Sequence, residues 1–428
     1  MLRQRLFSVA VIAVPVTLAL VIGSLGIGAD PLWYDELFTA DASSRGISGL
    51  LEHLWAFPTV PYMGLILVWT ISGAIDADWW LRVPSLIAVG VATAFTARTG
   101  VLLGGAKVGV SAGLLVAFNP LIIRYAQEAR PYAVGTAIAA LCLWLAVRWS
   151  LQPTRSTWIG LLVSVLFLAL FFAPGLVVLV PLSIFLVIGR REGRLVGSLQ
   201  RTDTVLAAAA FLLLFVFSIF SYLHRGEAMH GWLAVPTLNE LANGPAMLGY
   251  SLGAVLFIFA LLSRAGSIWL LGVVVGVMAI WIVSQMGSSW WLERSFITLT
   301  LPLALAVASV AARASWAQVT AAASLLALLV LPSVVSGNLQ REEGRTEADK
   351  ALSLAGLGGR GDVVVVGERP SLQFALERYA GDLSLDIRTT PNGYLGAFYS
   401  ADNLEGYNCE LVLAAEAPVN WWRCGEAG

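Results

Sequence analysis

Two adjacent carboxylates, Asp35 and Glu36, follow the first apolar segment of the chain in the aromatic stretch Trp33-Tyr34-Asp35-Glu36. A carboxylate beside a hydroxyl group can take its proton during a displacement, and carboxylates also hold divalent cations. Alternatively, Asp35 near the N-terminus of a short helix could cap that helix by accepting backbone N–H groups. The residue types alone leave both roles open.

Three further groups of charged residues are candidates for binding a charged substrate: Arg82, the pair Glu128 and Arg130, and the pair Glu293 and Arg294. The planar guanidinium group of arginine matches the geometry of a phosphate. The alternative for Glu128 and Arg130 is an ion pair at the membrane boundary, which contributes little free energy. The alternative for Arg82 and Arg294 is contact with ordinary lipid headgroups.

The composition places these groups in a membrane protein. The chain is 58% hydrophobic and 12% charged, with a mean hydropathy of +0.79, whereas soluble domains carry about 25% charged residues. The net charge of −1 argues against a nucleic-acid partner. The partner that the composition predicts is the lipid bilayer.

Apolar runs predict about eleven transmembrane helices, since a span needs about 20 apolar residues. They cover residues 6–27, 81–103, 108–126, 131–148, 157–172, 174–189, 204–222, 246–263, 267–286, 295–312 and 316–335. One more run, 59–75, is short, begins beside prolines and is interrupted by Gly64 and Gly73.

The positive-inside rule decides how the run at 59–75 lies. If it does not cross and the N-terminus is cytoplasmic, the basic loops face the cytoplasm, including the cluster of Arg190, Arg191, Arg194 and Arg201. If it crosses, this cluster lies outside. We therefore expect an interfacial helix in a first external loop, residues 28–80. Asp35, Glu36, Arg82, Glu128, Arg130, Glu293 and Arg294 then share the external side.

The composition changes near Ser336, so we expect a transmembrane domain over residues 1–335 and a small extracytoplasmic α/β domain over 336–428. Residues 361–367 and 410–414 have strand patterns and residues 372–379 a helical one. Cys409 and Cys424 lie in this tail. In an oxidising compartment they could form a disulfide, and two free thiols are the alternative.

The chain resembles the polytopic GT-C type glycosyltransferases that use polyprenyl-phosphate sugars. These include the dolichyl-phosphate-mannose protein mannosyltransferases and the bacterial lipid A aminoarabinose transferases. The resemblance covers about residues 1–310 and rests on short motifs in a shared order: Trp33-Tyr34-Asp35-Glu36, Val60-Pro61-Tyr62, Leu81-Arg82-Val83-Pro84-Ser85, Gln127-Glu128-Ala129-Arg130-Pro131-Tyr132 and Glu293-Arg294-Ser295-Phe296. Ser295 departs from the pattern, because relatives often have Tyr there.

The resemblance implies a catalytic acidic residue in the first external loop, which falls on Asp35 with Glu36 beside it. It implies a second functional site on Glu128 and Arg130. We expect the donor phosphate to contact Arg130, Arg294 or Arg82. No cofactor is certain, and a divalent cation near Asp35 and Glu128 stays open.

These features predict an inverting hexosyl- or pentosyltransferase at the external face of a bacterial plasma membrane. It would transfer a sugar from a polyprenyl-phosphate donor to an envelope glycan, glycolipid or protein acceptor. Two alternatives remain: a flippase for lipid-linked sugars and a non-catalytic envelope assembly protein.

Overall fold

The computed structural model describes residues 2–54, 59–72, 77–191, 234–286 and 289–335, and the short elements 363–365, 370–379, 386–388, 398–399, 408–413 and 421–425. Contacts divide the chain into two compact units. The membrane unit comprises Met1–Ile27 and Leu50–Leu339, and the loop–tail unit comprises Gly28–Gly49 and Gln340–Gly428. Residues 28–49, expected within the first loop of the transmembrane domain, thus group with the tail.

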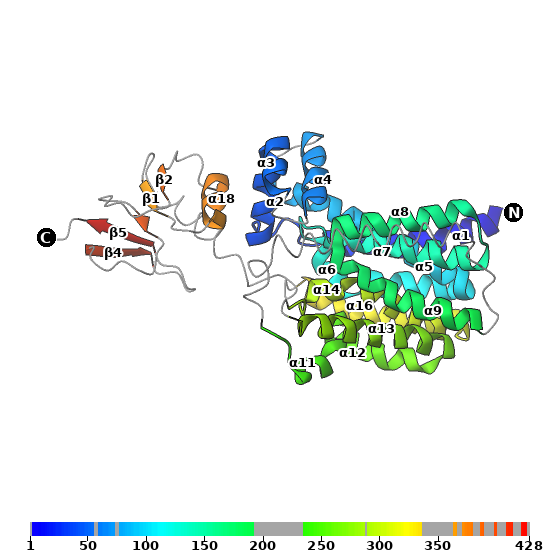
Figure 1. Cartoon of the computed structure of the whole chain (residues 1–428). Helices are drawn as coiled ribbons and strands as arrows, with labels where there is room; N and C mark the ends of the chain where they lie inside the picture. Colours follow the sequence, from blue (N-terminus) through cyan, green and yellow to red (C-terminus); the bar gives the residue numbers. More distant parts are fainter. Residues whose placement is uncertain are drawn as a thin grey trace. The chain divides into compact units, whose positions relative to one another are not determined.

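Helices build the described part of the membrane unit (Figure 1). They are α1 (Leu2–Ser24), α4 (Val60–Ile71), α5 (Asp78–Ala117), α6 (Pro120–Ala126), α7 (Tyr132–Leu151), α8 (Arg155–Phe172), η1 (Ala173–Val178), α9 (Leu179–Arg191), α11 (Leu238–Ala242), η3 (Gly244–Leu248), α12 (Tyr250–Phe259), η4 (Ala260–Leu262), α13 (Arg264–Ser284), α14 (Glu293–Phe296), η5 (Ile297–Leu299), α15 (Thr300–Ala308), η6 (Ser309–Ala312) and α16 (Trp316–Val335). Helix α3 (Gly46–His53) crosses the boundary between the two units.

Within the described residues, six helical segments are long and apolar enough to cross a membrane: Asp78–Ala117, Tyr132–Leu151, Arg155–Arg191, Arg264–Ser284, Glu293–Ala312 and Trp316–Val335. Shorter apolar helices cover Val9–Ser24, Val60–Ile71 and Tyr250–Leu262. The protein is a multi-pass membrane protein. The total of eleven spans stays a prediction, since the span expected at 204–222 lies outside the described residues.

Helix α5 contains a sharp reversal between two spans that the sequence predicts separately, at 81–103 and 108–126. Gly104 and Gly105 have non-helical backbone angles, and Gly105 has φ +79°, a conformation that glycine adopts without steric cost. Beyond this turn the two arms pack closely: a Cβ added to Gly100 would lie 2.9 Å from the Cα of Gly109. The turn therefore makes α5 a tight antiparallel hairpin.

Helix α4 has 12 residues, which corresponds to about 18 Å and falls short of a hydrocarbon core of about 30 Å. It packs on the start of α5, where the rings of Trp69 and Trp80 stack with centroids 4.7 Å apart. The indole Nε1 of Trp69 also donates to the carbonyl of Trp80 over 3.0 Å. This length and packing agree with the interfacial helix expected at 59–75.

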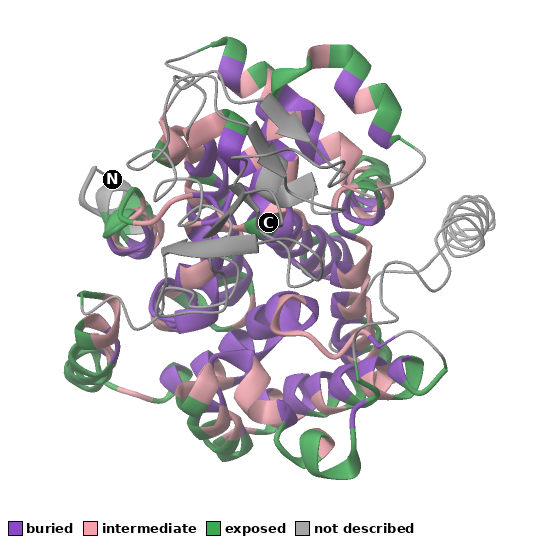
Figure 2. Cartoon of the chain, turned by 90° about the vertical axis from the view of Figure 1, so that its left-hand side faces the viewer, coloured by how far each residue is buried: buried purple, intermediate pink, exposed green. Residues whose placement is uncertain are grey.

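The buried residues of the membrane unit lie on the helix faces that turn toward one another (Figure 2). They include large side chains such as Trp269 and Phe296, both fully buried. Large apolar side chains also lie exposed, for example Ile258 at 67% and Leu328 at 73%. Such exposed apolar side chains suit contact with lipid, because a membrane helix need not hide its apolar face.

Within the loop–tail unit, helix α2 (Tyr34–Ser44) packs on helix α18 (Pro370–Tyr379) (Figure 1). The backbone N–H of Leu32 donates to the hydroxyl of Tyr379 over 2.8 Å, and the rings of Phe38 and Phe374 meet edge to face at 5.2 Å. Residues of the first loop and of the C-terminal segment thus form one small core.

The strands of this unit form a five-stranded sheet in the order β2-β1-β3-β5-β4. They are β1 (Val363–Val365), β2 (Asp386–Arg388), β3 (Phe398–Tyr399), β4 (Asn408–Leu413) and β5 (Trp421–Gly425). The register pairs Cys409 with Cys424 across the antiparallel strands β4 and β5. Paired Cα atoms in such strands are about 4.5–5.5 Å apart, within the range of a disulfide. The predicted disulfide and the extent of the α/β domain stay predictions, since much of 336–428 lies outside the described residues.

The packing of α13 on α9 yields a stability prediction. A Cβ added to Gly272 in α13 would lie 2.3 Å from the Cα of Pro181 in α9, so the backbones would have to separate. We expect Gly272→Ala to lower the stability by roughly 1–3 kcal/mol, measured as a fall in Tm of the purified protein in detergent. Gly160→Ala is the matched control, because its Cβ would meet nothing closer than 3.6 Å. An unchanged Tm for Gly272→Ala would contradict this packing.

Candidate functional site

A hydroxyl group in α5 holds the segment between α6 and α7 that carries Glu128 and Arg130. The Oγ of Ser85 donates to the carbonyl of Glu128 at 2.5 Å, and the carbonyl of Arg130 lies 3.4 Å away. The hydroxyl of Tyr62 in α4 lies 3.2 Å from the same Oγ. Three motifs that are far apart in the sequence therefore meet at the side chain of Ser85, which was not among the predicted site residues.

The same segment is tied to the end of α1. Gln127 donates through Nε2 to the carbonyl of Leu25 over 2.6 Å, and the buried Arg82 donates through Nη1 to the carbonyl of Ile27 over 2.9 Å. Arginine, with its five N–H donors, can bind a backbone carbonyl and still have donors for other groups. Arg82, predicted to contact a donor phosphate, thus also anchors the chain where it leaves the membrane unit at Ile27.

Two arginines from separate segments converge on the ring of Tyr132 at the start of α7. The guanidinium carbon of Arg130 lies 5.9 Å from the ring centroid, and that of Arg294 in α14 lies 5.8 Å from it. Arg294 also donates through Nη1 to the Tyr132 hydroxyl over 3.3 Å. Both distances are within the range of cation–π attraction. The predicted residues Arg130 and Arg294 are thus brought together, and Tyr132 is the residue that joins them.

Tyr132 itself has a fixed position. Only 4% of it is exposed, and its ring makes edge contacts with Tyr125 at 5.0 Å and Phe172 at 5.7 Å. A phenol packed on α6 and α8 gives the two arginines a rigid platform. The sequence signal for Tyr132 was its place directly after Arg130-Pro131.

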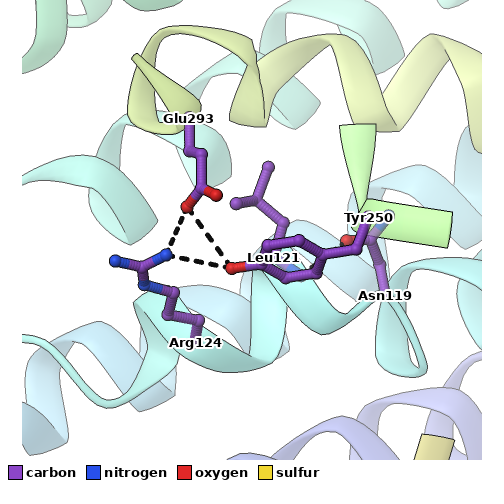
Figure 3. Close-up of polar contacts among 5 residues, drawn as sticks. All are labelled: Asn119, Leu121, Arg124, Tyr250 and Glu293. Carbon is purple, nitrogen blue, oxygen red and sulfur yellow. Dashed lines mark hydrogen bonds and ion pairs between the residues drawn. The ribbon is translucent and has the colours of Figure 1, made fainter. Parts of the chain in front are cut away.

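Glu293 contacts other residues than Arg294 does. Its carboxylate forms an ion pair with Arg124 of α6, and the hydroxyl of Tyr250 at the start of α12 donates to it over 3.3 Å (Figure 3). Arg124 also donates to the Tyr250 hydroxyl over 2.9 Å. Neighbouring residues on a helix point about 100° apart, so Glu293 and Arg294 face different groups. Arg124 and Tyr250 were not among the predicted site residues.

The backbone around Tyr250 is strained. Tyr250 has φ +55°, the one positive φ of a non-glycine residue in the described part of the chain, and Gly249 has φ +132°. The buried Asn119 secures this turn: its Nδ2 donates to the carbonyl of Leu248 over 2.9 Å, while its Oδ1 caps α6 by accepting from the N–H of Leu121. Asn119 thus fixes two helix starts: that of α12, where Tyr250 lies, and that of α6, the helix whose last turn carries Arg124.

Asp35 and Glu36 lie in the first turn of α2, in the loop–tail unit. Glu36 is 1% exposed, and its Oε2 accepts from the backbone N–H of Trp33 over 3.3 Å. Glu36 thus caps α2, a role that the sequence had offered to Asp35. Asp35 is half-buried, and its backbone carbonyl accepts from the Thr39 hydroxyl. The two adjacent carboxylates therefore have different surroundings, and that of Glu36 is used to cap α2.

The buried Glu128, 2% exposed, lies on the segment held by Ser85. Among the described residues, no group of three or more His, Cys, Asp or Glu side chains could hold a metal ion. The divalent cation near Asp35 and Glu128 stays a prediction.

Comparisons with known proteins give a structural likeness. No protein-family model matches the sequence, and no curated protein matches it. The crystal structure of ArnT from Cupriavidus metallidurans bound to undecaprenyl phosphate is similar, with a TM-score of 0.59 and 15% identity over 97% of this chain and 98% of that one. Its apo state gives a TM-score of 0.60 and 13% identity over 96% and 97%. The predicted resemblance is confirmed at the level of fold: this chain has the fold of ArnT, a lipid A aminoarabinose transferase of the GT-C type.

Proposed function

We propose that the protein is a membrane glycosyltransferase that takes a sugar from a polyprenyl-phosphate donor. The observation that carries this proposal is the convergence of Arg130 and Arg294 on Tyr132 in a chain whose fold matches a protein solved with undecaprenyl phosphate. A phosphate is the group that two guanidinium groups in one place would bind best, since their planar donors match its oxygens.

The surroundings of Arg294 support a phosphate contact. Glu293, its neighbour in sequence, pairs with Arg124 instead, so this carboxylate is engaged elsewhere. The Tyr132 ring faces both guanidinium groups and attracts them without neutralising their charge.

Asp35 is the proposed catalytic base. The acceptor hydroxyl loses its proton to the Asp35 carboxylate while its oxygen attacks the anomeric carbon of the sugar. The bond between that carbon and the phosphate oxygen breaks, and the polyprenyl phosphate leaves as a stable anion. A single displacement inverts the configuration at the anomeric carbon. Glu36 orients this segment through its hydrogen bond to Trp33. We propose that Arg82 on α5 and Glu128 on the segment between α6 and α7 support substrate binding.

We place the reaction at the external face of a bacterial plasma membrane, with an envelope glycan, glycolipid or protein as the acceptor and a hexosyl or pentosyl group as the cargo. The N-terminus would then be cytoplasmic and the C-terminal α/β domain external. The charge distribution of the loops supports this orientation.

Replacing Asp35 tests the base. We expect Asp35→Asn to lower transfer from a labelled polyprenyl-phosphate sugar about 10²–10⁴-fold, the usual contribution of a general base. Asp41→Asn on the same helix is the matched control, since Asp41 forms a surface ion pair with Arg45 at 2.6 Å. Near-normal transfer by a folded Asp35→Asn protein would show that Asp35 is not the catalytic base. Translocation of the lipid-linked sugar without transfer would favour a flippase.

Replacing Arg294 tests the phosphate contact. We expect Arg294→Gln to raise the KM for the donor about tenfold or more, because a charge-assisted contact is lost. Tyr132→Phe should have a smaller effect, since it removes only the hydroxyl that accepts from Arg294. The exposed Arg313 supplies the control as Arg313→Gln. Donor kinetics that stay unchanged in Arg294→Gln would exclude this arginine from the donor site.

A reporter fusion tests the orientation. A reporter enzyme that is active only outside the cytoplasm, fused after Ser336, should be active if the tail is external. The same reporter fused within the arginine cluster at Arg191 should be inactive and serves as the control. The reverse pattern would place the proposed site on the cytoplasmic face.

A further inference from the structure

A cavity of about 300 Å³ opens between α1, α5 and α7. Its walls are almost entirely apolar: α1 contributes Phe7, Val11 and Ile12, α5 contributes Val101 and Leu102, and α7 contributes Trp144. Phe7, Val101 and Leu102 are 50%, 38% and 39% exposed. The cavity is therefore accessible from the apolar surface that a membrane helix turns to lipid.

Arg98 lines this cavity, and Arg148 lies beside Trp144 in its wall. The guanidinium carbon of Arg98 is 6.0 Å from the ring centroids of both Phe95 and Trp144. That of Arg148 is 5.2 Å from the Trp144 ring. Both arginines are exposed, and neither forms an ion pair with a carboxylate in the described part of the chain. The aromatic pair thus holds two cationic groups beside an apolar slot.

This cavity is distinct from the candidate functional site. Along α5, Arg98 comes 13 residues after Ser85, and along α7, Trp144 comes 12 residues after Tyr132. At 1.5 Å per residue these separations are about 20 Å and 18 Å. Both helices thus place the cavity toward the other end of the membrane unit, near the turn at Gly104 and Gly105.

We propose that the cavity binds an anionic phospholipid, with an acyl chain in the apolar slot and the phosphate between Arg98 and Arg148. Basic groups beside a pocket between transmembrane helices have the chemistry that recognises an anionic headgroup. The apolar walls match an acyl chain, which a small soluble anion lacks. The inference does not depend on the proposed transferase activity.

Native mass spectrometry of the full-length protein in detergent tests this site with two lipids of equal chain composition, phosphatidylglycerol and phosphatidylcholine. We expect phosphatidylglycerol to bind roughly tenfold more tightly, from two arginines acting on one anionic headgroup. The double variant Arg98→Gln/Arg148→Gln should lose this preference. The control is Arg190→Gln/Arg191→Gln, which makes the same charge change at exposed residues of α9 and should keep it.

A second variant tests the slot without touching the charges. Ala106→Phe places a ring in the cavity that Ala106 lines and should abolish tight binding while both arginines remain. A preference that survives in both variants would overturn the proposal. Displacement of the lipid by millimolar glycerol phosphate would also overturn it, because the site would then recognise a free phosphate group rather than a lipid.

Discussion

The hydroxyl of Ser85 provides the interaction on which the candidate site depends. The segment from Gln127 to Arg130 lies between α6 and α7 and is not helical, so its backbone polar groups need partners outside a regular helix. Near a bilayer, irregular backbone persists only where the protein satisfies those groups. Ser85 does so for Glu128, and Tyr62 in turn contacts Ser85. The position of Arg130 follows from this short chain of hydrogen bonds.

A second constraint orients the other half of the site. The ion pair between Glu293 and Arg124 joins α14 to α6, and the strained turn at Tyr250 places a third polar group against it. Because α14 has only four residues, fixing Glu293 also fixes the direction of Arg294. A polar network that is satisfied inside the protein thus determines where a charged group beside it points.

The sequence predicted much of this arrangement. Apolar runs predicted the six long apolar helices among the described residues, and the short motifs named Glu128, Arg130 and Arg294, which lie on α14 and on the segment between α6 and α7. The partners were harder to predict. Glu293 and Arg294 are adjacent in the sequence, yet the rotation of about 100° per residue sends them to different neighbours. Ser85 and Asn119 are ordinary polar residues in sequence, and their importance depends on backbone groups more than 40 positions away.

The surroundings of Asp35 were also not predictable from the sequence. Its motif and its place after the first apolar run pointed to it, but no local pattern indicates that residues 28–49 group with the tail. That grouping comes from contacts of high sequence separation, which single-sequence periodicity does not reveal.

The hydrogen bond between Leu32 and Tyr379 joins residues 347 positions apart, and this has a consequence for biosynthesis. At about 5–20 residues per second, the ribosome needs on the order of 20–70 s to make Tyr379 after Leu32. During that interval α2, which carries Asp35, has no α18 to pack on. A chain that stops after α16 would contain Arg130 and Arg294 but would lack α18, the helix on which α2 packs. The order of synthesis thus means that α2 can pack on α18 only after residues 370–379 have been made.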